Sequence, residues 1–465
     1  MFLKFVNRRE ELTFLEERYK KPGFEFFVIY GRRRVGKTEL IKEFIKNKKH
    51  IYFLSDKSGT QKNLQRFKKS IAELLQEPII ETNDIYEIFK HLTKKTEKKE
   101  LIICFDEFSY LVEKDNAIPS MFQYLVDEIL SKTNIFLILC GSSISMMENG
   151  ILSQKSPLYG RKTAHIRLKP IRFAQFSEFF PSNTTETNIE LHSVLGGIPF
   201  YLDKFSQKKS VSENIAEQIL SKKGRLYEET DFLLKEELRE PDTYKSILES
   251  IASGRTKTVD ISNKARIKNQ DIDKYLKVLI NLGFIRREQP VTETKSKKSI
   301  YIFDDNFSNF WFQFCEPEKS ALEIGEIAKI KQTIKTRFPA YVGKKFEDLT
   351  RQIIPYTRNF QIQKVGKWWG HTRIDGVRKE IEIDLVALNK QTKDILFSEC
   401  KWQEKADAQK ILTELKEKSK YVQWNNETRK ENFAIFAKSF KRKENLGGNV
   451  KLYDLSEMEK IFKKK

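Results

Sequence analysis

The sequence lacks the features that mark membrane and secreted proteins. It has no apolar stretch of the roughly 20 residues that a membrane-spanning helix needs, and its opening residues, MFLKFVNRREEL, contain no signal-peptide run. Cysteine is scarce, and the four present lie far apart without a CxxC pair, which disfavours a disulfide framework and a zinc knuckle. None of the five histidines has a partner at metal-ligand spacing. We therefore expect a cytoplasmic protein that makes no membrane contact.

What the chain does contain is charge. Of its 465 residues, 32% are charged and 39% are hydrophobic, which is too apolar a composition for a disordered chain. Lys and Arg number 86 against 65 Asp and Glu, a net charge of +21. This excess favours a polyanionic partner such as DNA, but it fits a merely solvated, lysine-rich surface equally well. The length predicts about three domains.

The first 170 residues alternate short apolar runs with amphipathic segments. Runs that are apolar on both faces are typical of buried parallel strands, and the helical patterns between them predict a parallel α/β sheet. The expected strands are FFVIY (26–30), HIYFL (50–54), LIICF (101–105) and IFLILC (135–140), with helices such as 38–46 and 63–75 between them.

The pattern then changes, and the whole chain is predicted to be a multidomain α/β protein. Helical periodicity follows the sheet, two helices and a hairpin then give the outline of a winged helix, and the last part mixes a helix, strands and a basic tail. The predicted boundaries are 1–170 for the parallel-sheet core, 171–238 for a helical lid, 239–318 for the winged helix and 335–465 for a C-terminal α/β domain.

The predicted winged helix has two interpretations. If it binds DNA, its second helix, around 271–282, reads a groove and its basic side chains meet phosphates. In the other interpretation it packs on the nucleotide and acts as a conformational latch. The basic residues concerned are Lys268, Lys274, Lys277, Arg286 and Arg287, with Lys295, Lys297 and Lys298 at the hairpin tip.

A phosphate-binding loop follows the first predicted strand, and a helix leaves it. The segment GRRRVGKT fits G-x-x-x-x-G-K-[ST]. The glycines let backbone N–H groups close around phosphates, Lys37 would reach the β- and γ-phosphates of ATP, and Thr38 would ligate Mg²⁺. The helix N-terminus adds positive potential. The predicted site comprises Gly31, Arg32, Arg33, Arg34, Val35, Gly36, Lys37 and Thr38.

An acidic pair ends the third predicted strand, in LIICFDEFSYL. Asp106 would hold Mg²⁺ through water, and Glu107 would orient and polarise the attacking water. After the next strand, Ser142 is placed to sense the γ-phosphate. In SPLYGR, Arg161 would neutralise charge on the transferring phosphoryl group, unless it is a structural surface arginine.

The motifs FVNRREEL, GRRRVGKTEL, CFDEF, SPLYGR and GGIP (196–199) occur in one order. In this the sequence resembles the archaeal-type ATPases of the STAND branch of AAA-like P-loop NTPases, over about residues 3–235. The resemblance implies ATP and Mg²⁺ as ligands. It also implies that the element around Phe5 to Leu12 lies near the adenine and that Pro199 contacts the base.

Two further predicted strands carry acidic residues: Asp384 lies in 381–388, and Glu399 and Lys401 lie in 395–402. Alternation puts Glu399 and Lys401 on one face, and Asp384 can join them if the strands pair. Two carboxylates would then bind a second divalent cation while the lysine positions or deprotonates a water, and Glu347 could supply a third carboxylate.

This constellation, over about residues 338–425, resembles the PD-(D/E)XK nuclease fold, which implies a restriction-endonuclease-like C-terminal domain. Ile383 stands where that pattern often has proline. The alternatives are a solvated strand face with a cross-strand ion pair and an inert domain that only binds DNA.

The sequence thus predicts an ATPase joined to a DNA-binding, Mg²⁺-dependent nuclease. Three other schemes stay open: a STAND switch that uses ATP to form a homo-oligomer and is triggered by a protein partner, a repair or mobile-element protein with constitutive DNA affinity, and a DNA-binding regulator with an inert C-terminus.

Overall fold

The computed structural model describes residues 5–96, 101–293, 298–357, 360–374, 376–443 and 445–463. Lys295 and Lys297 of the predicted hairpin tip lie outside these ranges. The chain divides into two compact units: unit 1 comprises Met1–Pro170 with Ile198–Phe200, and unit 2 comprises Ile171–Gly197 and Tyr201–Lys465. Within the described ranges, no helix has both the length and the apolar composition required to cross a bilayer.

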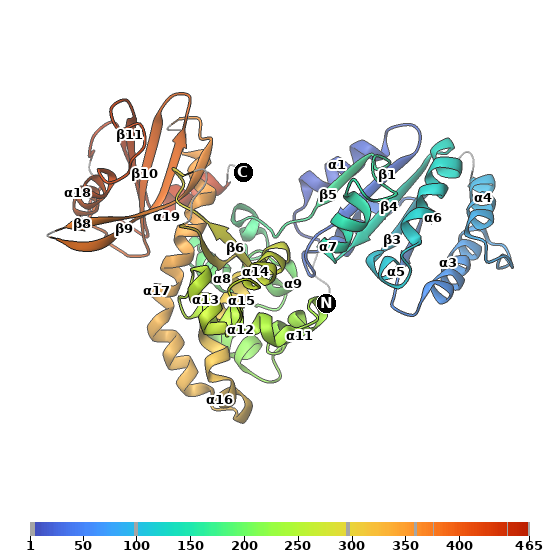
Figure 1. The fold of residues 1–465 in the computed structure, drawn as a ribbon, viewed down its shortest axis with the longest axis horizontal. Coiled ribbons are helices and arrows are strands. Elements are labelled where there is room, and N and C mark those ends of the chain that lie inside the picture. The colour runs from blue at the N-terminus through green and yellow to red at the C-terminus, as the bar shows by residue number, and fades with distance from the viewer. Residues whose placement is uncertain are drawn as a thin grey trace. The chain divides into compact units, whose positions relative to one another are not determined.

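Unit 1 contains a five-stranded parallel sheet made of β1 (Glu25–Tyr30), β2 (His50–Leu54), β3 (Leu101–Asp106), β4 (Ile135–Gly141) and β5 (Ala164–Arg167). The strand order is β2-β3-β4-β1-β5 (Figure 1). The three central strands are buried along their whole length, whereas β2 at one edge also has exposed residues. The predicted parallel sheet is confirmed. The short edge strand β5, AHIR, carries too little apolar pattern to be predicted.

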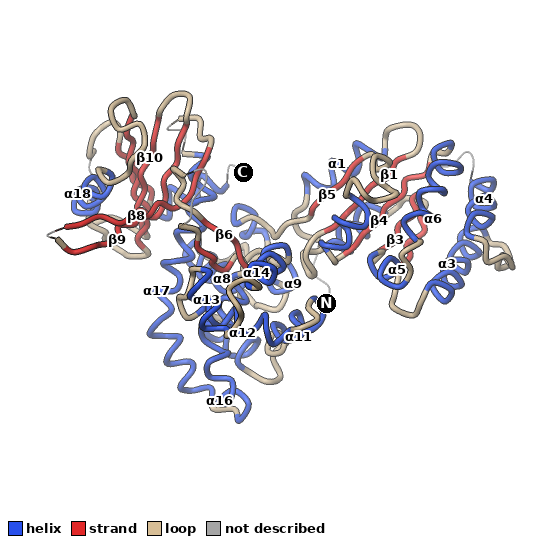
Figure 2. The backbone as a smooth tube through the Cα atoms, in the orientation of Figure 1, coloured by secondary structure: helices blue, strands red, loops and turns tan. Residues whose placement is uncertain are grey.

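Helices lie against both faces of this sheet (Figure 2). On one face, Phe136 of β4 packs against Phe44, with ring centroids 5.5 Å apart. On the other face, Phe105 of β3 packs against Phe67 at 4.9 Å and Phe122 at 5.2 Å. Because neighbouring residues of a strand point to opposite faces, one apolar run serves both layers. The helices of unit 1 are α1 (Arg9–Tyr19), α2 (Lys37–Ile45), α3 (Thr60–Leu75), α4 (Ile85–Thr96), α5 (Ser109–Lys114), α6 (Ile118–Tyr124) and α7 (Ile144–Met147).

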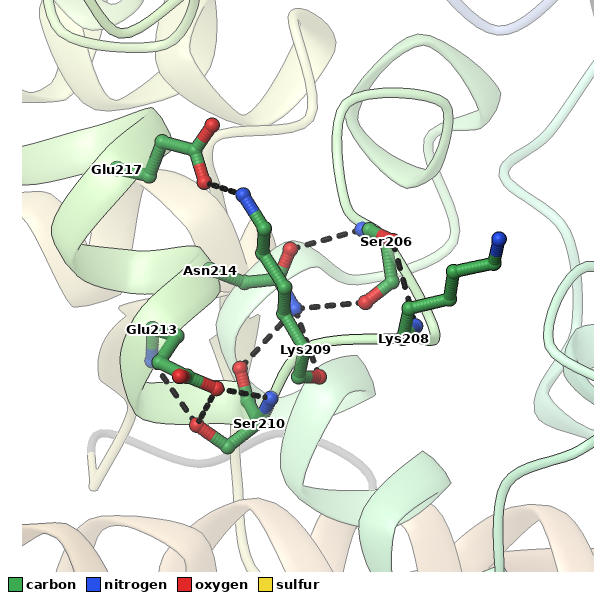
Figure 3. Close-up of polar contacts among 7 residues, drawn as sticks. All are labelled: Ser206, Lys208, Lys209, Ser210, Glu213, Asn214 and Glu217. Atoms are coloured by element: carbon green, nitrogen blue, oxygen red, sulfur yellow. Dashed lines mark hydrogen bonds and ion pairs between the residues drawn. The ribbon is translucent and has the colours of Figure 1, made fainter.

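The first part of unit 2 is helical. Its local signals are strong, as at the short helix α10, where Ser210 and Glu213 form a capping box: the Ser210 Oγ accepts from the Glu213 amide at 3.2 Å and the Glu213 carboxylate accepts from the Ser210 amide at 2.8 Å (Figure 3). Asn214 then closes the preceding loop onto Ser206. The helices are α8 (Thr185–Leu195), α10 (Val211–Ile215) and α11 (Glu229–Glu237), together with α9 (Pro199–Leu202), whose first two residues belong to unit 1.

Next come three helices and a hairpin, α12 (Pro241–Ala252), α13 (Thr258–Ala265), α14 (Ile272–Asn281), β6 (Ile285–Glu288) and β7 (Ile300–Phe303). The sequence pattern predicts α12, α14 and the antiparallel hairpin. It does not predict α13, whose eight residues, TVDISNKA, bury only Ile261 and Ser262. Helices α15 (Asn306–Phe310), α16 (Lys319–Ile324) and α17 (Ile327–Ile353) follow.

The C-terminal sheet of unit 2 has the order β12-β11-β10-β9-β8. Strands β8, β9 and β10 pair antiparallel, whereas β10, β11 and β12 pair parallel. Its apolar core includes Ile383, Phe397 and Leu415. The elements are β8 (Lys364–Ile374), β9 (Val377–Asn389), β10 (Asp394–Lys401), α18 (Ala408–Ser419), β11 (Lys430–Ala437), β12 (Val450–Tyr453) and α19 (Leu455–Lys463).

Candidate functional site

The loop between β1 and α2 has the backbone shape that its glycines permit. Gly36 has a φ of 92° and precedes the first residue of α2. Gly31 has a φ of 154°, and a Cβ built there would lie 2.4 Å from the carbonyl oxygen of Leu168. Both positions therefore need glycine, one for conformation and one also for space.

Lys37 opens α2, and its amine points back into this loop. The side chain is buried, and Nζ donates to the carbonyl oxygens of Gly31 at 2.9 Å and Arg32 at 3.1 Å. An ammonium held only by neutral carbonyls can turn toward an anionic phosphate, which offers a charged acceptor. The geometry thus suits phosphate binding by the loop.

Asp106 ends β3 beside Thr38. It is fully buried, and its Oδ2 accepts from the Thr38 hydroxyl at 2.7 Å and from the Tyr52 hydroxyl at 2.6 Å, while Oδ1 accepts from the Glu107 amide at 2.9 Å. A hydroxyl and a carboxylate in contact are the oxygen donors that Mg²⁺ takes.

Tyr52 is a partner of Asp106 that no motif reveals. It lies within HIYFL on the neighbouring strand β2. Burial and the Asp106 carboxylate raise the pKa of its hydroxyl far above the usual value, so Tyr52 remains a hydrogen-bond donor at neutral pH.

Glu107 and Ser142 meet at the ends of β3 and β4. The Ser142 hydroxyl donates to Glu107 Oε2 at 2.7 Å, and its amide donates to the same oxygen at 3.3 Å. Glu107 has a φ of 52°, in the left-handed region, which costs energy for a residue with a side chain. A carboxylate held in a strained turn at the strand ends is placed to face a nucleotide in the loop.

Segments on either side of the motif are tied to the phosphate-binding loop. The Arg8 guanidinium donates to the carbonyl oxygens of Val35 at 2.9 Å and Lys169 at 2.7 Å. The guanidinium of Arg34 lies 4.0 Å from the centroid of the Phe200 ring, and Pro199 next to it approaches Gly36. The elements around Phe5 to Leu12 and Pro199 therefore adjoin the loop, although their contacts with adenine stay predictions.

Arg161 has a structural partner. Its Nε and Nη2 contact the two oxygens of Asp127 at 2.7 and 2.8 Å, and Nη1 donates to the Pro157 carbonyl. This pair lowers the pKa of Asp127. The arrangement favours the surface-arginine interpretation within one chain, and action on a phosphoryl group would require Arg161 to exchange this partner.

In unit 2, the predicted carboxylates lie on the paired strands β9 and β10. The Asp384 carboxylate accepts from the Cys400 amide at 2.8 Å. Glu399 is buried, and its Oε1 lies 2.8 Å from Lys401 Nζ and 3.0 Å from Lys418 Nζ. Burial, together with the Glu399 and Glu347 carboxylates, raises the pKa of Asp384 to about 7.

Glu347 of α17 pairs with Lys367 of β8. In the parts of the chain that the structure describes, no group of three or more acidic, histidine or cysteine side chains is arranged to hold a metal ion. Among the described residues, the predicted set of Glu347, Asp384 and Glu399 is therefore not arranged as a three-carboxylate metal site.

The β6–β7 hairpin contacts α17 next to Glu347. Arg286 of β6 forms ion pairs with Asp348 and, at 3.0 Å, with Glu288. The Val291 amide donates to the Lys367 carbonyl at 2.9 Å. Arg286, predicted to meet DNA phosphates, thus faces inward, whereas Lys268, Lys274 and Arg287 are exposed.

Two family models match parts of this chain. A family described as an ATPase domain predominantly from Archaea matches residues 5–205, and a family of archaeal and bacterial proteins of unknown function matches residues 311–411. The uncharacterized protein MJECL04 of Methanocaldococcus jannaschii is 39% identical over 462 residues, which is 97% of this chain and 99% of that protein.

Two further similarities concern the ATPase part and the fold. The uncharacterized ATP-binding protein MJ0423 of the same organism is 58% identical over 45 residues, 10% of this chain and 76% of that protein. The solved Walker-type ATPase PABY2304 of Pyrococcus abyssi aligns with 66% of this chain and 96% of its own, at a TM-score of 0.50 and 21% identity, which shows a likeness of fold.

Proposed function

Because this chain belongs to the same family as MJECL04 and contains a P-loop ATPase domain of the archaeal type, we propose that it hydrolyses ATP with Mg²⁺. We further propose that the nucleotide state controls DNA binding and DNA cleavage by unit 2. The observation that carries the ATPase half is the contact between Thr38 and Asp106 at 2.7 Å, directly after the phosphate-binding loop.

The proposed roles follow from the contacts. Lys37 would leave the loop carbonyls for the β- and γ-phosphates, and Thr38 and Asp106 would hold Mg²⁺, which would neutralise phosphate charge when bound. Glu107 would exchange its bond with Ser142 for the attacking water, and Ser142 would then be placed to sense whether the γ-phosphate is present.

Two substitutions separate binding from hydrolysis. Lys37→Ala is expected to lose most ATP affinity, measured by calorimetry with Mg²⁺. Glu107→Gln keeps a side chain of the same size and is expected to bind ATP normally but to lose at least about 100-fold in turnover. Glu113→Gln, on α5, is the matched control and should keep both activities. Normal ATP binding by Lys37→Ala would contradict the proposal.

For unit 2 we propose a divalent-cation-dependent phosphodiesterase site. It is supported by the position of Asp384 and Glu399 on paired strands with Lys401 beside them. Carboxylate oxygens suit Mg²⁺ or Mn²⁺, and Mg²⁺ is commonly held by one or two carboxylates together with water and substrate phosphate. The metal would polarise the phosphodiester, and Lys401 would position or deprotonate the attacking water.

The arrangement of α12, α13, α14 and the β6–β7 hairpin supports a winged helix as the DNA-binding element. Its exposed Lys268, Lys274 and Arg287 would meet phosphates.

The test incubates the full chain with plasmid and linear DNA, Mg²⁺ or Mn²⁺, with and without ATP. Cleavage that is lost in Asp384→Ala and Lys401→Ala variants, but kept in Lys405→Ala, would support the site. A requirement for ATP would show coupling. Binding without cleavage under every condition would favour a DNA-binding regulator, and ATP-dependent oligomers would favour a triggered switch.

A further inference from the structure

Glu399 has two lysine partners, and the second was not predicted from the sequence. Lys401 Nζ contacts only Oε1, at 2.8 Å. Lys418 Nζ contacts both carboxylate oxygens, Oε1 at 3.0 Å and Oε2 at 3.2 Å. Because Glu399 is only 5% exposed, its carboxylate requires compensating cations. Lys418 supplies one by contacting both carboxylate oxygens.

The fold directs Lys418 to this position. Leu412 and Leu415 of α18 are buried in the core, and Lys418 lies three residues beyond Leu415 on the same side of the helix. The end of α18 is fixed by the residue that precedes β11, because the Arg429 guanidinium donates to the carbonyl oxygen of Ser419 at 3.0 Å. The Lys418 ammonium therefore reaches Glu399, near the end of the central strand β10, and is partly shielded from solvent.

We propose that Lys418 is a built-in counter-cation that competes with a divalent metal for Glu399 and so sets the metal affinity of the site. The inference rests on the proposed function of Asp384 and Glu399 as metal ligands. A divalent cation on the Glu399 oxygens repels the Lys418 ammonium. It also needs the oxygen lone pairs that now accept hydrogen bonds from Lys418. Lys401 contacts one oxygen and can remain. Lys418 then leaves Glu399, and its positive charge becomes available to a DNA phosphate.

The experiment titrates Mn²⁺ into the full-length chain by calorimetry, with Asp384→Ala identifying the heat that belongs to this site. Lys418→Met keeps the length of the side chain and removes the charge. It is expected to bind Mn²⁺ about tenfold more tightly, since it removes a charge-assisted contact that the metal must displace. Lys420→Met is the matched control: Lys420 lies two residues away, is exposed and pairs with Glu417, and its loss should leave the affinity unchanged.

A second measurement uses the unaltered chain, so it does not depend on how the variant folds. Lysine acetylation by a small reagent, followed by mass spectrometry, should increase at Lys418 when Mn²⁺ is added and stay constant at Lys420.

The outcomes separate this inference from the function on which it rests. Two results would overturn the competition alone. In the first, Mn²⁺ binding is lost in Asp384→Ala but is equal or weaker in Lys418→Met. In the second, acetylation of Lys418 does not change when Mn²⁺ is added. If no Mn²⁺ binding depends on Asp384, the metal site and the competition are overturned together.

Discussion

Tyr52 offers a stringent test of the nucleotide site, because it shares one oxygen of Asp106 with Thr38. Both hydroxyls donate to Oδ2, at 2.6 and 2.7 Å. When Thr38 turns to Mg²⁺, Tyr52 keeps that oxygen in position. Tyr52→Phe removes one hydrogen bond to a buried carboxylate, worth about 1.5–3 kcal/mol. At the lower end this equals about a tenfold change in an equilibrium constant.

We therefore expect Tyr52→Phe to need about tenfold more Mg²⁺ for half-maximal ATP hydrolysis, while ATP binding in EDTA is unchanged. Tyr341→Phe is the matched control, because its buried hydroxyl donates to the Ser193 carbonyl at 2.9 Å within unit 2. It should lower stability by a similar amount without shifting the Mg²⁺ requirement. An unchanged Mg²⁺ requirement in Tyr52→Phe, or an equal loss of ATP binding in EDTA, would refute this positioning role.

Two other predictions concern stability, and a third concerns ATP binding. Arg286→Met removes the cation that pairs with Asp348 and one of the two that pair with buried Glu288, the other being Arg351. It should lower the free energy of unfolding in urea by about 3 kcal/mol, whereas exposed Arg287→Met should change it little. His192 is buried, and burial lowers its pKa to about 4, so between pH 6.5 and pH 4 the unfolded chain binds a proton that the folded chain does not. The free energy of unfolding should therefore be highest above pH 6.5 and fall by up to about 3 kcal/mol toward pH 4. His192→Gln should lose this pH dependence in acid-titration measurements. Gly31→Ala places a Cβ 2.4 Å from the Leu168 carbonyl and should abolish ATP binding, with circular dichroism checking that the rest of the chain folds.

The elements that the sequence predicts well are those whose signal is local. The central strands of unit 1 are buried on both faces, so their runs are apolar without interruption. The phosphate-binding loop needs its residues consecutively, because backbone amides must close around one phosphate. Asp384 and Glu399 could be placed on strands by alternation, yet their pairing depended on the register of β9 against β10, which a sequence alone does not give.

The partners of the site residues were harder to predict, because they come from elsewhere in the chain. Tyr52 lies 54 residues before Asp106, and Lys418 lies 19 residues after Glu399. Asp127 forms an ion pair with Arg161, which lies 34 residues later in the chain. In each case the local pattern is that of an ordinary strand or helix, and only the three-dimensional packing brings the polar atoms together. Lys418 has one usable signal, its position in register with the buried Leu415.

The lysines of the C-terminal site also bear on the net charge of +21. Lys367 pairs with the partly buried Glu347, and Lys401 and Lys418 pair with the buried Glu399. Pairing of this kind does not by itself account for the excess, because most ion pairs consume one positive and one negative charge. The 86 Lys and Arg side chains outnumber the 65 Asp and Glu that could neutralise them one to one. Whether DNA is held at the carboxylates themselves is a separate matter, decided by whether Lys418 remains on Glu399 or is released to a phosphate.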